Sequence, residues 1–565
     1  MFNKLIARFQ DKTANHPLGN DANIDNVLAD ISLGDPERAL IDVDDWLVAM
    51  KGHASEIGWP LVQHALFRLD QYSIECAGQL LVSYLSENAR EFMSEAIWSR
   101  LDTHSTELFQ CHADVLHMLA HEAKNDADKL RMARSAARAM RAWSSRKKLQ
   151  RLRYRLPTAA LWQSAHDLMR VLARAGLLQI PVEAYRDEAS TTPLNEYLMG
   201  LYLEFVPVGN LVPQQLEFAD RLIRANSSSG GLELNPQPHD ATNYLIDVSL
   251  GEGPRRFEEF DPTNPNLRYC STSKLRAPLM KLANQVRRQT DVPAWLTSLP
   301  ASRSQIETAI LTLALHWAPT PPKRMTARIN TKNELRVLFG FSLCRRMVAA
   351  SHFARMGRQF KYDGLDFERL YDEARFGRIQ SNIPDPNADV AETVAIATPL
   401  EILRRLELAG DKAQMESWIQ VDGSDTGLGA TVPAIFARHR IGALVGLRHA
   451  DGLEWQLGII RRIGRDASNR PNIGIETLGR PSICAQAKPV STSGDWRAKI
   501  DTGHDGWSDA IIVSQEGKEL LLPAGSFEAG LQVMTRSEEG SRQLQLQSLL
   551  DRGLDYDRIE FIDIN

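Results

Sequence analysis

Hydrophobic residues recur at three- and four-residue spacing from about residue 24 to residue 225, which is the pattern of helices that bury one face. One such run consists of Leu61, Val62, Ala65, Leu66 and Leu69. Short proline-containing segments interrupt the pattern at 34–36, 58–60 and 156–158. Helices separated in this way are typical of stacked helical hairpins, although no fixed repeat period is present. We predict an α-helical domain at 1–225.

The next segment, 226–317, has a different character. Its first half is rich in serine, glycine, asparagine and proline around a strand-like stretch at 243–248, and helical patterning returns at about 274. Pro319-Thr320-Pro321-Pro322 follows, and a stiff, extended stretch of this kind usually separates domains. We therefore predict a mixed, loop-rich connector with helices at 226–317.

After this linker the hydrophobic pattern changes to a period of two. Residues 334–341 alternate as a strand does, helical patterning occupies about 342–413, and strand-like segments with glycine-rich turns continue from Trp418. Such short strands indicate a small antiparallel barrel. We predict an antiparallel β-barrel domain at 318–565 with a helical insertion at about 342–413. The fold class is then α+β multidomain, with a mostly α-helical N-terminal region.

Composition narrows the class of protein. A chain of 565 residues is too long for one hydrophobic core, and 43% hydrophobic with 24% charged residues is ordinary for a globular protein. The net charge of −5 gives no general attraction to nucleic acid or to an anionic membrane. An anionic ligand would therefore need a local basic site.

The cysteines and the N-terminus favour a reducing compartment. The five cysteines are scattered without CxxC spacing, as expected of buried reduced thiols. The sequence turns polar by Arg8, too early for a signal peptide, and no run approaches the ~20 apolar residues of a membrane span. We expect a cytoplasmic protein without membrane insertion.

Two short motifs lie on either side of the expected insertion. Lys323-Arg324-Met325-Thr326-Ala327-Arg328 follows the linker and precedes the first strand, and Asp422-x-Ser424-x-x-Gly427 opens a strand-to-strand turn. Four other Arg-x-x-x-Arg spacings lie within helical or strand patterning, so context singles out Arg324 and Arg328. The Asp422 motif occurs once.

In this order the two motifs resemble the RxxxR and [D/N]xSxxG elements of the PilZ family, bacterial receptors for the second messenger cyclic di-GMP, and the residue types are those that such a ligand would need. A guanidinium fork fits the O6/N7 edge of guanine or a phosphate, and its flat face stacks on a purine. The carboxylate of Asp422 could accept from guanine N1–H and N2–H. The hydroxyl of Ser424 could bond phosphate or backbone, and Gly427 would permit positive φ or close approach of a ligand.

The resemblance covers roughly 320–345 and 415–490, including a hairpin at 455–461 and 473–476. It implies that cyclic di-GMP is the ligand and that an N-terminal arm carrying the arginines orders on it. The residues it assigns to the ligand site are Lys323, Arg324, Arg328, Asp422, Ser424 and Gly427.

The spacing of the motifs departs from the family pattern. Asp422 lies 94 positions (422 − 328) beyond Arg328, whereas the family usually has a few tens of residues there. A helical insertion in a loop between strands would explain the gap, because long loop insertions are tolerated. The resemblance also implies an unidentified protein partner in motility, pilus, exopolysaccharide or biofilm control.

Two other features allow more than one interpretation. Residues 129–155 contain eleven basic and no acidic residues, which could bind nucleic acid or an acidic protein, or form a solvated helix face that balances acidic neighbours. His117 and His121 share a helical face at metal-ligand spacing, but the HExxH glutamate and a third ligand are missing. We expect ordinary helix histidines and no metal.

No catalytic motif is present in a fitting context. Serine–histidine, Walker, GxGxxG and paired-carboxylate arrangements are missing, as are the EAL, GGDEF and HD signatures of cyclic di-GMP enzymes. We expect a receptor without catalytic residues or cofactor. The alternatives are a ligand-free adaptor built on the same barrel and a nucleic-acid-binding protein that uses 129–155.

Overall fold

The computed structural model describes residues 17–564 with interruptions. The residues left out within this range are 19, 32–33, 53, 55–57, 87–94, 120–124, 227–230, 237–242, 258–262, 319–327, 356–402, 404–414, 467, 491–505, 514–517 and 538–539. The chain divides into two compact units, an N-terminal unit at Met1–Lys323 and a C-terminal unit at Arg324–Asn565.

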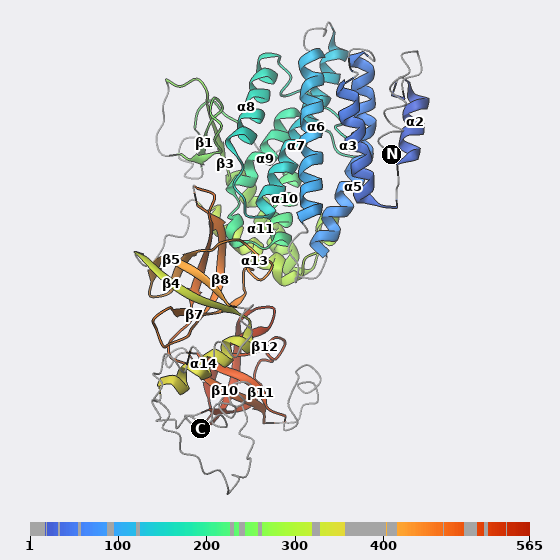
Figure 1. Ribbon diagram of the computed structural model, residues 1–565. Helices are drawn as coiled ribbons and strands as arrows, with labels where there is room; N and C mark the ends of the chain where they lie inside the picture. Colours follow the sequence, from blue (N-terminus) through green and yellow to red (C-terminus); the bar gives the residue numbers. More distant parts are fainter. Residues whose placement is uncertain are drawn as a thin grey trace, which may run out of the picture. The chain divides into compact units, whose positions relative to one another are not determined.

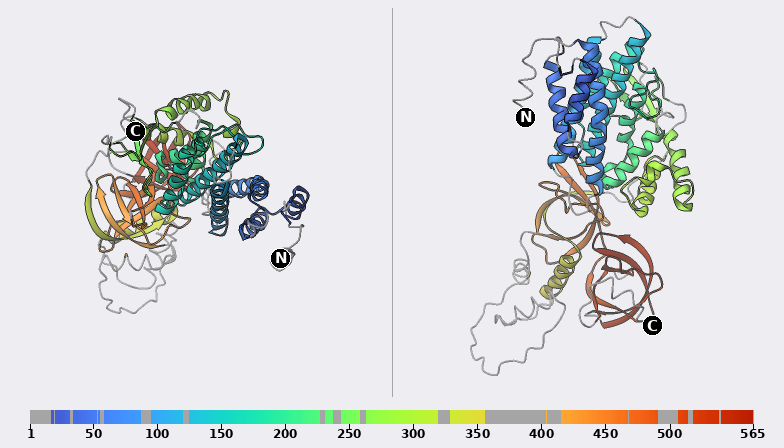
Figure 2. Two further views of the ribbon diagram at one scale, coloured as in Figure 1. Left: turned by 90° about the horizontal axis from the view of Figure 1, so that it is seen from above. Right: turned by 90° about the vertical axis from the view of Figure 1, so that its right-hand side faces the viewer.

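The N-terminal unit is built mainly from helices that run side by side, seen from the side in Figure 1 and nearly end-on in the left-hand view of Figure 2. Its larger helices are α2 (Asp21–Asp30), α3 (Pro36–Gly52), α5 (Trp59–Ser86), α6 (Glu95–Leu119), α7 (Asp126–Leu152), α8 (Ala159–Arg174), α9 (Pro193–Tyr202) and α10 (Pro213–Asn226). Several begin at a side chain that accepts a backbone N–H, as Asn125, Thr158 and Thr192 do. The period-3.6 pattern therefore identifies a helical region, as predicted.

The expected connector packs onto these helices. A three-stranded antiparallel sheet places β1 (Asn243–Asp247) between β2 (Arg255–Arg256) and β3 (Leu267–Ser271). The helices α11 (Ser273–Arg288), α12 (Ala294–Thr297) and α13 (Arg303–His316) follow. The buried indole of Trp317 donates to the carbonyl of Phe205 at 2.9 Å, which ties the end of this segment to the helices.

Helix α7 carries most of the basic segment 129–155, and three of the eleven cations of this segment, Arg138, Lys147 and Lys148, are buried. Arg138 donates to Asp70 at 3.1 Å, and Lys148 lies 2.9 Å from both Glu217 and Asp220. The segment does balance acidic neighbours, which was one of our interpretations, but three of its paired cations are buried rather than solvated. Cations that already have buried acidic partners are poorly placed to bind nucleic acid.

Lys147 is the most buried of these cations, with no exposed side-chain surface. Its ammonium lies 2.9 Å from the carboxylate of Glu204, which Arg151 also contacts. Burial lowers the pKa of Lys147 to about 8, although Glu204 opposes the shift. Burial also disfavours the charge on Glu204, but Lys147 and Arg151 outweigh it and lower the pKa of Glu204 to about 2.

The C-terminal unit contains two closed six-stranded antiparallel barrels. The first barrel consists of β4 (Ile329–Phe339), β5 (Glu416–Ser424), β6 (Gly427–Thr431), β7 (Leu444–His449), β8 (Gln456–Arg465) and β9 (Pro471–Thr477). The second barrel consists of β10 (Ser482–Pro489), β11 (Ser508–Val513), β12 (Glu519–Pro523), β13 (Gln532–Ser537), β14 (Gly540–Arg552) and β15 (Tyr556–Asp563). The strand orders are β4-β5-β6-β9-β8-β7 and β10-β11-β12-β15-β14-β13, so the two barrels share one topology.

This result confirms the α+β multidomain class but differs from our expectation of a single barrel. The alternating pattern identifies strands and their buried faces, whereas the closure of each barrel depends on which strands pair. The helix α14 (Phe341–Arg355) follows β4, where the helical insertion was expected. Most of the remaining insertion lies outside the described residues.

The two barrels share a hydrophobic core with α14. Leu338 and Leu457 of the first barrel, Phe341 of α14, and Ile511 and Leu521 of the second barrel belong to one buried cluster. Polar contacts reinforce this junction, since Arg558 of β15 donates to Glu476 of β9 at 2.8 Å. Within the part of the chain that the structure describes, no helix has the length and apolar character needed to cross a membrane.

Candidate ligand-binding site

The structure brings Arg328 of the first motif next to the second motif in the first barrel. Arg328 lies immediately before β4, Asp422 and Ser424 end β5, and Gly427 begins β6. The strands β4 and β5 pair with Asn330 opposite Asp422. Lys323 and Arg324, the other two predicted site residues, lie outside the described residues.

Arg328 and Asp422 form a direct ion pair despite the long insertion between them. The Nη1 atom of Arg328 donates to both carboxylate oxygens of Asp422, at 2.6 and 2.8 Å. The two side chains are 29% and 23% exposed, so the pair is reachable from solvent. Within the described residues the Nε and Nη2 donors of Arg328 form no hydrogen bond. Because a guanidinium has five N–H donors in a fixed fork, the contact with Asp422 uses only part of the donor capacity of Arg328.

Ser424 and Gly427 close the turn between β5 and β6. The Ser424 hydroxyl donates to the carbonyl of Gly427 at 3.1 Å, so it bonds the backbone, one of the two roles that we had considered for it. The φ angle of Gly427 is not in the left-handed region. A Cβ at this position would instead lie 2.6 Å from the carbonyl oxygen of Ile475. Glycine is therefore needed here for close packing of β6 against β9.

Gly429 is a residue of the candidate site that we did not predict. It lies opposite Asp422 in β6, and a Cβ there would meet a carboxylate oxygen of Asp422 at 2.7 Å and Nη1 of Arg328 at 3.3 Å. The missing side chain thus lets the ion pair lie flat against the sheet. The sequence signal was a second glycine two positions after Gly427, on the same face of the strand.

Glu416 anchors the start of β5, the strand that carries Asp422. Its carboxylate accepts from the indole of Trp418 at 2.7 Å, contacts the buried ring of His439 at 3.0 Å and also contacts Arg438. Burial raises the pKa of a carboxyl group, but the contacts with His439, Trp418 and Arg438 outweigh it and lower the pKa of Glu416 to about 2.

This pKa predicts an acid-sensitive contribution to the stability of the C-terminal unit. The folded pKa lies below the ordinary value of 4.5, so the ionised group stabilises the fold above pH 4.5 and loses this effect as the pH falls toward about 2. Glu416→Gln should lower the free energy of unfolding by about 1–2 kcal/mol at pH 7, allowing for solvent screening. Thermal unfolding of both proteins between pH 2 and 7 measures the difference.

The matched control for this variant is Glu334→Gln in β4, where the carboxylate is 48% exposed and pairs with Arg336 at 3.6 Å. It should change stability by less than about 0.5 kcal/mol. If the difference in thermal stability between wild type and Glu416→Gln stayed constant from pH 7 to pH 2, the role given to Glu416 would be contradicted.

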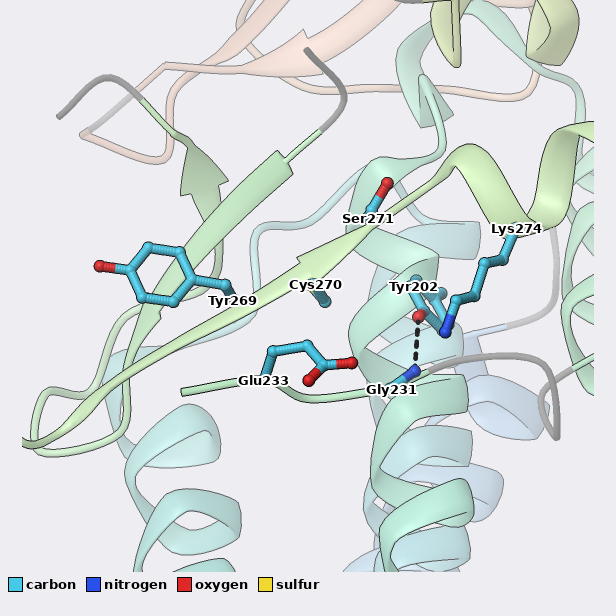
Figure 3. A pocket seen from close by; sticks show the side chains of 7 residues that line it. All are labelled: Tyr202, Gly231, Glu233, Tyr269, Cys270, Ser271 and Lys274. Carbon is cyan, nitrogen blue, oxygen red and sulfur yellow. Dashed lines mark hydrogen bonds between the residues drawn. The ribbon is translucent and has the colours of Figure 1, made fainter. Parts of the chain in front are cut away.

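Cavities in the described part of the chain differ greatly in size. The pocket shown in Figure 3, between β3 and α9, is lined by Tyr202, Glu233 and Lys274 and has a volume of about 10 Å³, which accommodates no more than a water molecule. A cavity of about 250 Å³ in the N-terminal unit is lined by Trp59 and His117 among others. Neither presents a pair of guanidinium groups.

A larger cavity of about 430 Å³ lies in the first barrel, within the usual range for small-molecule pockets. Leu428, Arg448, Gln456 and Arg480 are among its lining residues. Leu428 directly follows Gly427 in β6, so the cavity borders the strand that begins at this motif residue. Arg448 donates to three nearby backbone carbonyls, which gives it a structural role.

No metal site can be described at His117 and His121, the two histidines that the sequence places at metal-ligand spacing. His117 lies near the end of α6, and His121 falls outside the described residues. Among the described residues, no group of three or more histidine, cysteine, aspartate or glutamate side chains could hold a metal ion.

Comparison with known proteins relates the N-terminal unit to a class of cyclic di-GMP receptors. Residues 22–237 match the family model described as "Cyclic-di-GMP receptor FimW, N-terminal domain". No curated protein and no solved structure matches the chain. The match covers helices α2–α10 and none of the barrels, and it describes a receptor domain rather than an enzyme family. It supports a cyclic di-GMP receptor without specifying the PilZ family.

Proposed function

We propose that this protein is a cyclic di-GMP receptor and that its first barrel binds the ligand as a PilZ-type domain. The observation that carries the proposal is the ion pair between Arg328 and Asp422, which joins the two motifs across 94 positions of sequence. Independent support comes from the N-terminal unit, where residues 22–237 resemble a cyclic di-GMP receptor domain. The two lines of support concern different parts of the chain and agree on the ligand.

The proposed contacts follow from the chemistry of guanine and phosphate. The carboxylate of Asp422 accepts from N1–H and N2–H of guanine, and Arg328 directs its remaining donors to the phosphate or to the O6/N7 edge. Lys323 and Arg324, on the segment that precedes Arg328, add cationic contacts to the phosphates. Ser424 and Gly427 hold the turn in the shape that presents Asp422.

We further propose that the protein transmits the signal by binding rather than by catalysis. A cytoplasmic receptor of this type would couple cyclic di-GMP to a protein partner in motility, pilus, exopolysaccharide or biofilm control. The two barrels are joined by a common hydrophobic core and by the Glu476–Arg558 contact. These contacts offer a route by which ligand binding at the first barrel could alter the conformation of the second barrel. An affinity pull-down with and without cyclic di-GMP tests this, and an identical set of captured proteins would count against it.

Isothermal titration calorimetry of the full chain with cyclic di-GMP tests the proposed function. We expect saturable heat with cyclic di-GMP and a much weaker response to cyclic di-AMP, because adenine lacks the N1–H and N2–H donors that Asp422 requires. Absence of binding to cyclic di-GMP, both in calorimetry and in equilibrium dialysis, would overturn the proposal. Binding to both dinucleotides with equal affinity would overturn the role of Asp422.

A further inference from the structure

The cavity of about 430 Å³ in the first barrel is distinct from the motif site, because none of the motif residues that the structure describes lines it. In the closed strand order β4-β5-β6-β9-β8-β7, the strands β6 and β7 lie on opposite sides of the barrel. Leu428 of β6 and Leu447 of β7 both line the cavity. The cavity therefore lies inside the barrel rather than on its outer surface.

The cavity has an apolar floor and a polar mouth. Leu335, Leu428 and Leu447 supply the floor, and each is at most 7% exposed. The mouth lies at the end of the barrel where β7 connects to β8 and where β9 ends. The polar side chains that line the mouth are His449, Glu454, Gln456 and Arg480. An occupant that matches this lining has an apolar body and one polar end.

Internal hydrogen bonds hold the mouth in place. The buried Arg448 donates to three backbone carbonyls of the β7–β8 connection, at 2.8 to 3.1 Å. The side chain of Gln456 donates to the carbonyl of Leu478 at 3.3 Å and accepts from Arg480. The mouth is therefore largely pre-formed, as small-molecule sites usually are.

The cavity lining carries more positive than negative charge. Arg448 and Arg480 are cations, whereas Glu454 is the one carboxylate among the described lining residues. Arg480 is exposed, and within the described residues only its Nη2 atom forms a hydrogen bond, to Gln456. Its Nε and Nη1 donors make no such contact, so this guanidinium can pair with an anionic group at the mouth.

We propose that the cavity binds an aliphatic carboxylate of medium chain length, with its chain on the leucine floor and its carboxylate paired with Arg480. The lining favours a chain over a nucleobase, because no tryptophan, tyrosine or phenylalanine is among the described lining residues and a base would have no such ring to stack on. This carboxylate is a second ligand of the chain, and its binding does not depend on the proposed function.

Isothermal titration calorimetry of the full chain with decanoate tests the proposal. We expect saturable binding, with the affinity rising by about fourfold for each methylene from hexanoate to decanoate, because each methylene is buried on the floor. Leu447→Phe, which places a larger side chain on the floor, should weaken the binding of decanoate about 10-fold or more.

A comparison of decanoate with decanol tests the role of Arg480. Arg480→Ala should weaken the binding of decanoate about 10-fold and leave the affinity for decanol unchanged, because the alcohol has no charge to pair. Arg470→Ala is the matched control, since it removes an exposed arginine at the turn of the β8–β9 hairpin. This variant should bind decanoate as wild type does.

Absence of saturable decanoate binding by wild type would overturn the proposal. Unchanged binding in a folded Leu447→Phe protein would also overturn it, because the ligand would then lie elsewhere. Equal losses for decanoate and decanol in Arg480→Ala would overturn the pairing with the carboxylate. Thermal midpoints show whether each variant is folded. If Leu447→Phe is not, hydrogen exchange of wild type replaces it: decanoate should protect residues 444–456, and no protection there would overturn the proposal.

Discussion

Arg328→Ala should weaken the binding of cyclic di-GMP to the full chain by about 30-fold or more, as measured by isothermal titration calorimetry. The substitution removes a guanidinium that the proposed site directs to the ligand, and it leaves the carboxylate of Asp422 without its partner. Truncating one member of a hydrogen-bonded charge pair at a binding site typically costs ~2–5 kcal/mol. Asp422→Ala should have an effect of similar size, since it removes the acceptor for guanine N1–H and N2–H.

Arg336→Ala is the matched control for this prediction. Arg336 also lies on β4, its side chain is 43% exposed, and it contacts Ser417 at 2.9 Å and Glu334 at 3.6 Å, away from the motif residues. Its removal should leave the affinity within about twofold, as expected for a rim or remote charge. An Arg328→Ala protein that binds as tightly as wild type would contradict the proposed site.

Asp70→Ala should lower the free energy of unfolding of the N-terminal unit by about 3–5 kcal/mol. Asp70 is 1% exposed and accepts from Arg138 at 3.1 Å and from the Tyr185 hydroxyl at 3.1 Å, and it contacts His112 at 3.0 Å. Burial disfavours its charge, but Arg138 and His112 outweigh burial and lower the pKa of Asp70. The variant would leave the buried guanidinium of Arg138 uncompensated. Urea denaturation followed by circular dichroism measures the loss.

Asp126→Ala serves as the control for Asp70→Ala. Asp126 lies at the start of α7 with a 99% exposed side chain and a weak contact with Lys129 at 3.4 Å. Its removal should cost less than about 1 kcal/mol. If Asp70→Ala were no more destabilising than Asp126→Ala, the stabilising role given to the buried Asp70–Arg138 pair would be contradicted.

Local patterns were sufficient to predict the secondary structure of both regions. The three- and four-residue spacing identified the helices of the N-terminal unit, and the alternation after residue 328 identified strands such as β4 and β8. The buried cations of α7 could not be recognised in the same way. Their acidic partners, such as Asp70 and Glu217, lie about 70 positions away on other helices, so a one-dimensional charge pattern shows the basic residues without their partners.

The candidate site was predicted only in part, because some of its residues come together only through the pairing of strands. Arg328, Asp422 and Ser424 were recognised because each belongs to a motif with a recognisable residue type and spacing. Gly429 depends on strand register, because a glycine carries no signal until β5 and β6 are aligned. The presence of two barrels was missed for the same reason, since closure is a property of pairing between strands.

Hydrogen–deuterium exchange of the full chain with and without cyclic di-GMP tests the central claim most directly, because it reports where the ligand binds. We expect slower exchange on ligand addition in residues 416–431, which contain Asp422 and the turn to β6, and in residues 471–477, the strand that pairs with β6. The same protection should be lost in Arg328→Ala. Protection confined to residues 22–237, with no change in the first barrel, would contradict the account.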